Sequence, residues 1–245
     1  MSPEVTLLAA VALPFVALPA VLALHRRPNL REAATLVTAL CLVLLVLSLA
    51  NQVQQGARPA ARVVETLPGL AIAFEAEPLG VLFALLASFL WLVTSVYSIG
   101  YMRGHGEAHQ TRFYACFAAA LGSTMGVALA GNLFTLFIFY ELLTLTTYPL
   151  VTHSGDAAAR RAGRVYLGLL LGSSVAFFLL ALVATWSLTG TLAFRHGGIL
   201  AGVVSPGTAA ILLALYLFII ARMIGGLGVG AALEVGLQPG AHQSH

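Results

Sequence analysis

Long apolar runs separated by short polar connections are the feature that most restricts how this chain can fold. A helix needs roughly 20 apolar residues, rising about 1.5 Å each, to cross the ~30 Å hydrocarbon layer of a membrane. Seven runs approach that length, at 4–24, 34–50, 80–102, 113–131, 133–151, 165–189 and 207–224. Only 9% of the residues are charged, against about 25% in a soluble domain, and the mean hydropathy is +0.95. The sequence therefore predicts an all-α membrane protein with about seven transmembrane helices, forming one domain over 1–245 that ends in a polar tail at 225–245.

Small residues recur every four positions within two of these runs. They are Ala118, Gly122, Gly126 and Ala130 in the fourth run, and Gly168 and Gly172 in the sixth. Such ridges let helix backbones approach closely, so we expect a packed bundle. Only Gly131 and Asn132 separate the fourth run from the fifth, which predicts a tight antiparallel helical hairpin.

The basic residues, all of them arginine, are distributed unevenly between the connections. With the N-terminus outside, the inner connections hold Arg26, Arg27, Arg31, Arg103, Arg112, Arg160, Arg161 and Arg164, and the outer ones hold Arg58, Arg62 and Arg195. Inner connections carry an excess of positive charge. We therefore expect an integral protein of a bacterial inner (cell) membrane, with the N-terminus outside and the C-terminus cytoplasmic.

One long connection, 51–79, ends in "FEAEPLG" on the predicted outer face. Glu75 and Glu77 alternate with apolar residues immediately before Pro78, which favours an extended approach to the third helix. Carboxylates in such a position are usually solvated loop charges, and a role in proton access is the alternative.

A single carboxylate, Glu141, lies near the middle of the fifth run, "NLFTLFIFYELLTLTTYPLVTH". A charged side chain at that depth costs about 2.5–3.5 kcal/mol on insertion scales, so it is expected to face a protein interior or a hydrated cavity. Withdrawal from water favours the protonated carboxyl group. Glu141 is therefore a candidate for taking up and releasing protons.

The helix face of Glu141 supports that hypothesis. Thr144 and Tyr148, at i+3 and i+7, share its face and supply hydroxyl groups, whereas Phe137 and Phe134 lie one and two turns in the other direction. This arrangement suits a hydrated half-channel that ends at a carboxylate. The alternative is a permanently neutral acid that holds two helices together.

The remaining polar residues offer little enzyme chemistry. The sequence shows neither a phosphate-binding glycine loop nor a nucleophile with a paired base, and the two cysteines match no metal-ligand spacing. No cofactor or metal is expected, although a quinone site leaves only weak sequence traces. His153, at the inner end of the fifth run, could pass protons between cytoplasm and channel because histidine titrates near neutrality. Arg222 is the cation nearest to the end of the seventh run.

Four sequence elements resemble one family of membrane proteins. They are "YSIGYM" ending the third run, "RFY" opening the fourth, "GNLFTLFIFYELLTLTTYPLV" in the fifth, and "RRAGRVYL" opening the sixth. Together with the weaker "EPLGVLF", they resemble the antiporter-like proton-pumping subunits of respiratory complex I and of Mrp-type cation/proton antiporters. The resemblance implies two inverted five-helix repeats, in which a fifth-helix glutamate pairs with a lysine on a broken seventh helix. Glu141 matches that glutamate.

This chain departs from the family pattern in two ways. In "GLGVGAALEVGLQPGAH" the lysine position aligns with Gly230, and the sequence contains no lysine. Family members are also about twice as long, so we expect an antiporter-like subunit fold that lacks the second inverted repeat. Because an arginine stays protonated, Arg222 is a poor substitute in a proton relay.

Two functions follow from the resemblance. The first is a membrane subunit contributing a proton, or cation/proton, half-channel to a complex I-like NADH:quinone oxidoreductase or an Mrp-type antiporter. The alternative is a non-pumping structural or assembly subunit of such a complex. In either case the chain would be at most a non-redox subunit, and its expected partners are other membrane subunits, the lipid bilayer and protons or Na⁺, with no nucleic acid.

Overall fold

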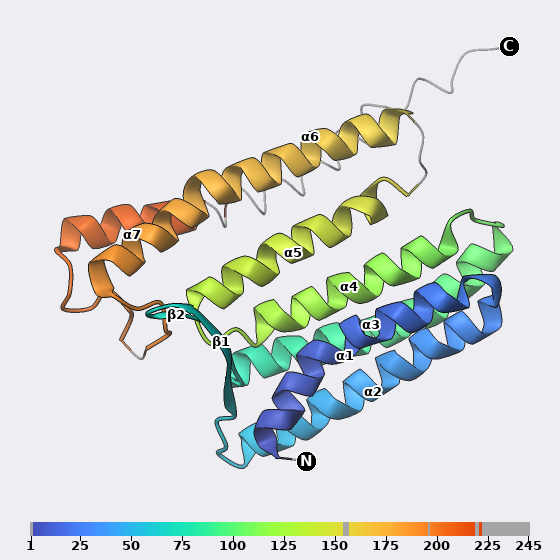
Figure 1. Cartoon of the computed structure of the whole chain (residues 1–245), viewed down its shortest axis with the longest axis horizontal. Coiled ribbons are helices and arrows are strands. Elements are labelled where there is room, and N and C mark those ends of the chain that lie inside the picture. The colour runs from blue at the N-terminus through green and yellow to red at the C-terminus, as the bar shows by residue number, and fades with distance from the viewer. Residues whose placement is uncertain (1, 154–156, 196, 219–220, 222–245) are drawn as a thin grey trace, which may run out of the picture. The chain divides into compact units, whose positions relative to one another are not determined.

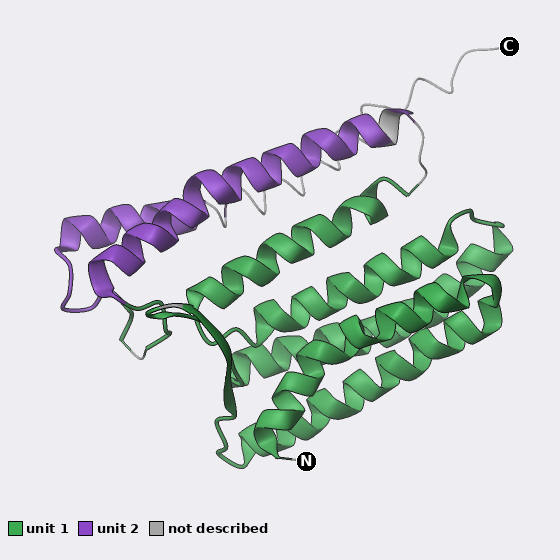
Figure 2. Ribbon diagram, in the orientation of Figure 1, with its two compact units in different colours: residues 1–153, 191–199 green, residues 154–190, 200–245 purple. Residues whose placement is uncertain are grey.

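The structure, a computed structural model, describes residues 2–153, 157–195, 197–218 and 221. The chain divides into two compact units (Figure 2). Unit 1 comprises Met1–His153 together with Thr191–Ile199, and unit 2 comprises Ser154–Gly190 together with Leu200–His245. Glu141 and its surroundings belong to unit 1.

In its described residues, unit 1 has five α-helices and a β-hairpin (Figure 1). The helices are α1 (Pro3–Ala23), α2 (Pro28–Gln54), α3 (Pro78–Gly104), α4 (Gln110–Ala128) and α5 (Leu133–Val151), with a short 3₁₀ turn, η1 (Leu24–Arg26), after α1. The hairpin strands are β1 (Ala60–Leu67) and β2 (Leu70–Glu75). In the part of the chain that the structure describes, β1 and β2 are the strands of its one sheet, so the fold is helical almost throughout.

Local sequence explains where these helices begin. Proline occupies the first turn of α1, α2 and α3, where its missing N–H costs no helical hydrogen bond. Asn132 caps α5, because its side-chain oxygen accepts a hydrogen bond of 2.7 Å from the backbone N–H of Thr135. Pro14 and Pro19 lie inside α1, which continues through both.

The unit 1 helices pack in pairs around one apolar core. α1 packs on α2 and α4, α2 packs on α3, and α4 packs on α5. The predicted ridge on α4 is one packing face, since Gly122 faces the ring of Phe15 and Gly126 faces the ring of Phe139. The largest fully buried apolar side chains of the core are Leu7, Leu42, Leu49, Trp91, Met125 and Leu129.

The β-hairpin lies at the end of unit 1 where α4 turns into α5. Its strands are antiparallel, with Ala60 opposite Glu75 and Leu67 opposite Leu70, and Gly69 makes the turn at φ 81°. The α4–α5 turn continues this layer, because the N–H of Gly131 donates to the carbonyl of Ala73 (2.9 Å). Residues 191–199, the second part of unit 1, also join this layer, since the N–H of Leu133 donates to the carbonyl of Leu192 (3.1 Å). The extended stretch that the sequence predicts before Pro78 is thus the second strand of a hairpin.

Among its described residues, unit 2 has one long helix and one shorter helix. The long helix comprises α6 (Ala157–Ser173), a π-helical segment η2 (Ser174–Leu179) and α7 (Leu180–Thr189), and the shorter helix is Pro206–Phe218. The hydroxyl groups of Thr185 and Tyr216 lie 3.1 Å apart and join the two helices. A Cβ on Gly168 or Gly172 would meet nothing within 4 Å, so the predicted ridge on this helix faces open space among the described residues.

Five of the described helices are long and apolar enough to cross a membrane. They are Pro3–Arg26, Pro28–Gln54, Pro78–Gly104, Leu133–Val151 and Arg160–Thr189. Many of their large apolar side chains are more than half exposed, Leu79 (79%) and Leu82 (64%) among them, as expected for surfaces that face lipid. The protein is an integral membrane protein, and the predicted all-α class is confirmed. The arrangement of seven spans in a single domain stays a prediction.

Candidate functional site

The candidate site is centred on Glu141, the ninth of the 19 residues of α5. Eight helical residues precede it and ten follow it, which places it near the middle of a membrane-length helix. Both of its carboxylate oxygens are withdrawn from the solvent-accessible surface. The residue as a whole is half-buried, and the carboxylate predicted from the apolar run is its buried part.

An aromatic cluster lies between Glu141 and the hairpin end of α5. Phe139, two residues before Glu141, fits against Gly126 of α4 and makes ring contacts with Phe74 of β2 and Phe15 of α1. The ring centroids are 5.4 Å apart for Phe74 and 6.4 Å apart for Phe15. These packed rings close the interior of unit 1 toward the hairpin.

Hydroxyl groups follow Glu141 in the opposite direction along α5. Thr144 is buried, with 4% of its surface exposed, and its Oγ1 donates to the Tyr140 carbonyl at 3.1 Å. Tyr148 is half-buried one turn further on. Helical periodicity brings both residues onto the face of Glu141, whereas Thr146 and Thr147 lie on adjacent faces and bond back to the helix in the same way.

His153 lies just beyond the C-terminal end of α5, against the first turn of α4. Its ring packs edge-on against Phe113, with centroids 5.7 Å apart, and neither ring nitrogen has a hydrogen-bond partner among the described residues. The guanidinium of Arg112 donates to the His153 carbonyl at 3.1 Å. Burial, and then the nearby charge of Arg112, lower the pKa of His153 below its ordinary value, so the imidazole is neutral at neutral pH.

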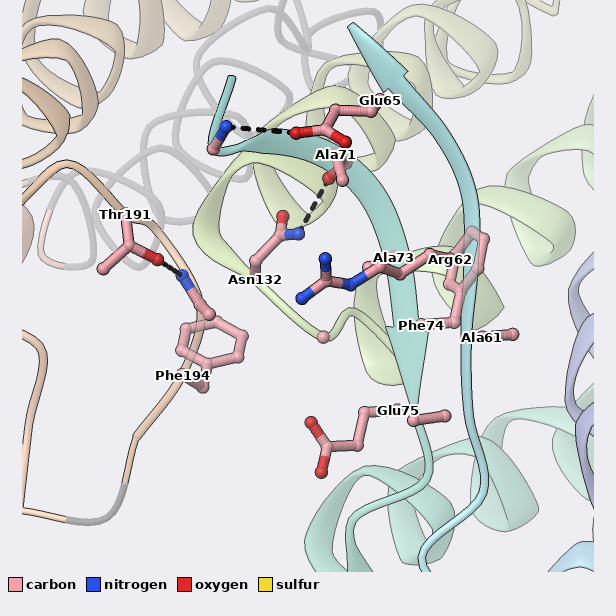
Figure 3. Close-up of a pocket in the computed structure, with 14 residues that line it drawn as sticks. Ala61, Arg62, Glu65, Ala71, Ala73, Phe74, Glu75, Asn132, Thr191 and Phe194 are labelled. Carbon is pink, nitrogen blue, oxygen red and sulfur yellow. Dashed lines mark hydrogen bonds between the residues drawn. The ribbon is translucent and has the colours of Figure 1, made fainter. Parts of the chain in front are cut away.

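A cavity of about 360 Å³ opens at the hairpin end of unit 1 (Figure 3). Arg62, Glu65 and Glu75 from the hairpin line it, together with Asn132 and Phe194. The amide nitrogen of Asn132 donates to the Ala71 carbonyl at 2.8 Å, which ties the start of α5 to β2. Glu141 does not line this cavity, whereas Phe74 does. Of the two acids in "FEAEPLG", the structure places Glu75 at the cavity and Glu77 at the start of α3.

A buried ionic cluster at the opposite end of unit 1 was not anticipated from the sequence. Glu32 is 4% exposed and accepts hydrogen bonds from Nε and Nη2 of Arg103. Arg31, also 4% exposed, lies 3.5 Å from Glu32 and donates to Thr111 and Gln110. Because α2 begins at Pro28, the helix includes Glu32, which lies just before the apolar run 34–50. A search for charged residues in the first helical turns beside each run would have found it.

The other sequence-predicted residue, Arg222, lies outside the described residues. Glu141, Thr144 and Tyr148 thus share one helix, and His153 follows at its end.

The matched family region includes the whole of α5. Residues 130–228 match the transmembrane family described as NADH:quinone oxidoreductase/Mrp antiporter. NADH-quinone oxidoreductase subunit N of Desulforudis audaxviator is 28% identical over 167 residues, which are 68% of this chain and 32% of that protein. A probable K⁺/H⁺ antiporter subunit of Rhizobium meliloti is 31% identical over 116 residues, or 47% of this chain and 21% of that protein.

Two solved structures share the fold. A chain of the Mrp complex from Dietzia sp. DQ12-45-1b superposes with a TM-score of 0.74 at 24% identity, covering 90% of this chain and 41% of that one. A chain of an archaeal membrane-bound sulfane sulfur reductase superposes with a TM-score of 0.74 at 22% identity, covering 88% and 44%. This chain therefore spans less than half of the length of these proteins.

The membrane-length helices and the arrangement of the chain are those of an integral membrane protein with the fold of these antiporter-like chains. Over residues 130–228 the chain is similar to the NADH:quinone oxidoreductase/Mrp antiporter family. Both the predicted fold and the family resemblance are confirmed.

Proposed function

We propose that this chain supplies a proton, or cation/proton, half-channel to a multi-subunit membrane complex, with Glu141 as the residue that carries the proton. The observation that carries the proposal is a carboxylate near the middle of a membrane-length helix with both oxygens buried. A group so costly to insert is rarely kept without a role in ion or proton movement.

The surroundings of Glu141 favour access from one side only. The packed rings of Phe74, Phe139 and Phe15 close the hairpin end, whereas Thr144 and Tyr148 offer hydroxyl groups toward the other end. Hydroxyl groups can donate and accept protons in a hydrogen-bonded chain with water. His153 follows at this end of α5; its lowered pKa favours the neutral imidazole, whose nitrogen lone pair would be the proton acceptor there.

The names of the relatives support the kind of partner and the kind of ion that we propose for this chain. Their names include a subunit of an NADH-quinone oxidoreductase and of K⁺/H⁺ and Na⁺/H⁺ antiporters. We therefore expect this chain to assemble with other membrane subunits and to move protons, alone or in exchange for an alkali cation. The arginine distribution favours a bacterial cell membrane with the N-terminus outside. Labelling of Arg58→Cys by an impermeant thiol reagent from outside intact cells, with Cys41 and Cys116 replaced by serine, tests that orientation.

The decisive experiment replaces Glu141 by glutamine in the full chain, purified with its co-purifying subunits and reconstituted into liposomes. Loss of the ionisable group should abolish ion-gradient-driven proton movement, read from an internal pH dye, without loss of assembly. Glu141→Asp, which keeps a carboxyl group, should retain part of the rate. Glu4→Gln, at an exposed carboxylate in the first turn of α1, is the matched control.

The same variants separate the half-channel from a purely structural role. If Glu141→Gln moves protons at the unaltered rate while Glu141→Ala weakens assembly, the residue is a neutral anchor and the proposal is wrong.

A further inference from the structure

One face of the β-hairpin combines charged side chains with alanines. Each charge lies opposite an alanine on the other strand, in the pairs Arg62 with Ala73, Glu65 with Ala71 and Glu75 with Ala60. Val63 is an extra residue in β1 that shifts the register, so that Glu65 and not Val64 shares the face of Arg62. Because alanine is small, these charged side chains border open space, the cavity of about 360 Å³ at the hairpin end of unit 1 (Figure 3).

Arg62 and Glu75 face this cavity together but do not pair with each other. Arg62 lies opposite Ala73, and Glu75 is two residues further along β2, so the two residues are diagonal neighbours, about 7–8 Å apart at the backbone. Figure 3 shows both side chains extending from the hairpin toward the side on which Asn132 and Phe194 lie. Within the part of the chain that the structure describes, neither charged group forms an ion pair or a side-chain hydrogen bond. A guanidinium and a carboxylate are thus both available to a ligand.

The other polar groups around the cavity are engaged or uncharged. Oε1 of Glu65 accepts a hydrogen bond of 3.3 Å from the N–H of Gly69. The side chain of Asn132 bonds at its two ends to the backbone of β2 and of α5. The wall that faces the hairpin is completed by uncharged residues, namely Gly131, Thr191, Ala193 and Phe194. Arg62 and Glu75 therefore decide the chemistry of the ligand.

This pair of charges selects a zwitterion. A simple anion bound at Arg62 would lie beside the carboxylate of Glu75, and a simple cation bound at Glu75 would lie beside the guanidinium, so each would be opposed by one like charge. A ligand that carries an anionic group and an ammonium group a short distance apart satisfies both side chains. The cavity volume is at the lower end of the roughly 300–1,000 Å³ typical of small-molecule sites, which suits a ligand group of this size.

The position of the cavity indicates the source of such a ligand. Asn132 immediately precedes α5, and Glu75 ends β2 shortly before α3 begins at Pro78. Both helices are long and apolar enough to cross a membrane. The cavity therefore lies where these helices leave the hydrocarbon layer, at the depth of the lipid headgroups. Phe194, which is 44% exposed, adds an apolar surface that the glycerol region of a lipid can contact and that a free zwitterion would not use.

We propose that the hairpin cavity binds the headgroup of an aminophospholipid, with its phosphate at the guanidinium of Arg62 and its ammonium at the carboxylate of Glu75. Ala73 and Ala60, opposite these two residues, leave the room that the headgroup occupies. The site lies apart from Glu141 and does not depend on its role.

The test compares spin-labelled lipids that differ in headgroup, each as a minor fraction of a phosphatidylcholine bilayer that contains the full chain. Phosphatidylethanolamine has a phosphate and a primary ammonium, whereas phosphatidylglycerol lacks the ammonium. Labelled phosphatidylethanolamine should therefore associate more strongly than labelled phosphatidylglycerol or phosphatidylcholine. Glu75→Gln should weaken the association of phosphatidylethanolamine roughly two- to fivefold, the range for a solvated ion pair, and should not weaken that of phosphatidylglycerol. Arg62→Gln should weaken both.

Matched controls and a steric variant accompany these two substitutions. Arg58→Gln and Glu77→Gln remove exposed charges that do not line the cavity, so they should leave the preference unchanged. Ala73→Leu keeps both charges but fills the space beside Arg62, so it should also weaken the association of phosphatidylethanolamine. Circular dichroism establishes that each variant is folded.

Three results would overturn the proposal. The first is equal association of labelled phosphatidylethanolamine and phosphatidylglycerol with the unaltered protein. The second is an unchanged preference in both Arg62→Gln and Glu75→Gln. The third is displacement of the labelled lipid by millimolar phosphoethanolamine, which would show that a soluble zwitterion, and not a lipid, is the ligand.

Discussion

The ring of Phe139 occupies the space that a side chain on Gly126 would need. A Cβ placed on Gly126 would overlap Cδ1 of Phe139, well inside van der Waals contact. This contact joins α4 to α5 two residues before Glu141. Phe139 also packs against the ring of Phe74, which lines the cavity at the hairpin end of unit 1. The absent side chain of Gly126 therefore helps to fix the position of the helix that carries the candidate proton site.

Replacing Gly126 by alanine should destabilise unit 1. Overpacking of a filled interior costs about 1–3 kcal/mol, and the gain in helix propensity of about 0.5–1 kcal/mol offsets only part of it. The midpoint of denaturant unfolding in detergent should fall. Gly100→Ala is the matched control, because a Cβ there would meet nothing within 4 Å, so its midpoint should stay the same or rise.

Asn132 makes two hydrogen bonds that a single substitution can separate. Its Oδ1 caps α5 through Thr135 N–H (2.7 Å), and its Nδ2 donates to the Ala71 carbonyl (2.8 Å). Asn132→Ala loses both bonds and should lower the free energy of unfolding by about 1–2 kcal/mol. Asn132→Asp keeps the capping oxygen but sets a carboxylate oxygen, in place of the donor, against the Ala71 carbonyl. A smaller loss than that of alanine would show that the cap carries most of the effect.

Glu32 should be more important for stability than its exposed partner Arg103. Glu32→Gln leaves the guanidinium of Arg31 buried without a counter-charge, and breaking a buried pair in this way costs about 3–5 kcal/mol. Arg103→Gln leaves Glu32 with Arg31 3.5 Å away, so its unfolding midpoint should fall less. A larger fall in the unfolding midpoint for Arg103→Gln than for Glu32→Gln would contradict the idea that Glu32 mainly neutralises Arg31.

Glu141 could be located from the sequence because a charge within a largely apolar helix of 19 residues is conspicuous. Glu32 could not be located in the same way, since the helix containing it starts in a polar segment, and the contacts with Arg103 come from a residue 71 positions away. Such distant pairing depends on how α2 and α3 pack, which periodicity does not reveal.

The sequence contains signals for the whole β-hairpin, and not only for the extended stretch before Pro78. Three of the five residues in "RVVET" are β-branched, which favours a strand. Pro68-Gly69 is then a strong turn signal before the second strand, "LAIAFE". The small-residue ridge on α4 is recognisable from the sequence as a packing face. Its partners, Phe15 and Phe139, lie on different helices, and spacing within one helix cannot identify them.

His153 should make the protein sensitive to mild acid. Because its pKa is lowered on folding, the unfolded state binds more protons as the pH falls through the ordinary histidine value of about 6.5. The stabilisation is therefore complete above that value and is lost as the pH falls from there toward the lowered pKa. Melting temperatures between pH ~7.5 and ~5.5 should fall less steeply for His153→Gln than for the unaltered protein. The control is His25→Gln, at an exposed imidazole on η1, which should keep the original dependence of melting temperature on pH. If His153→Gln shows the same dependence as His25→Gln, the imidazole beside Phe113 and Arg112 does not control acid stability.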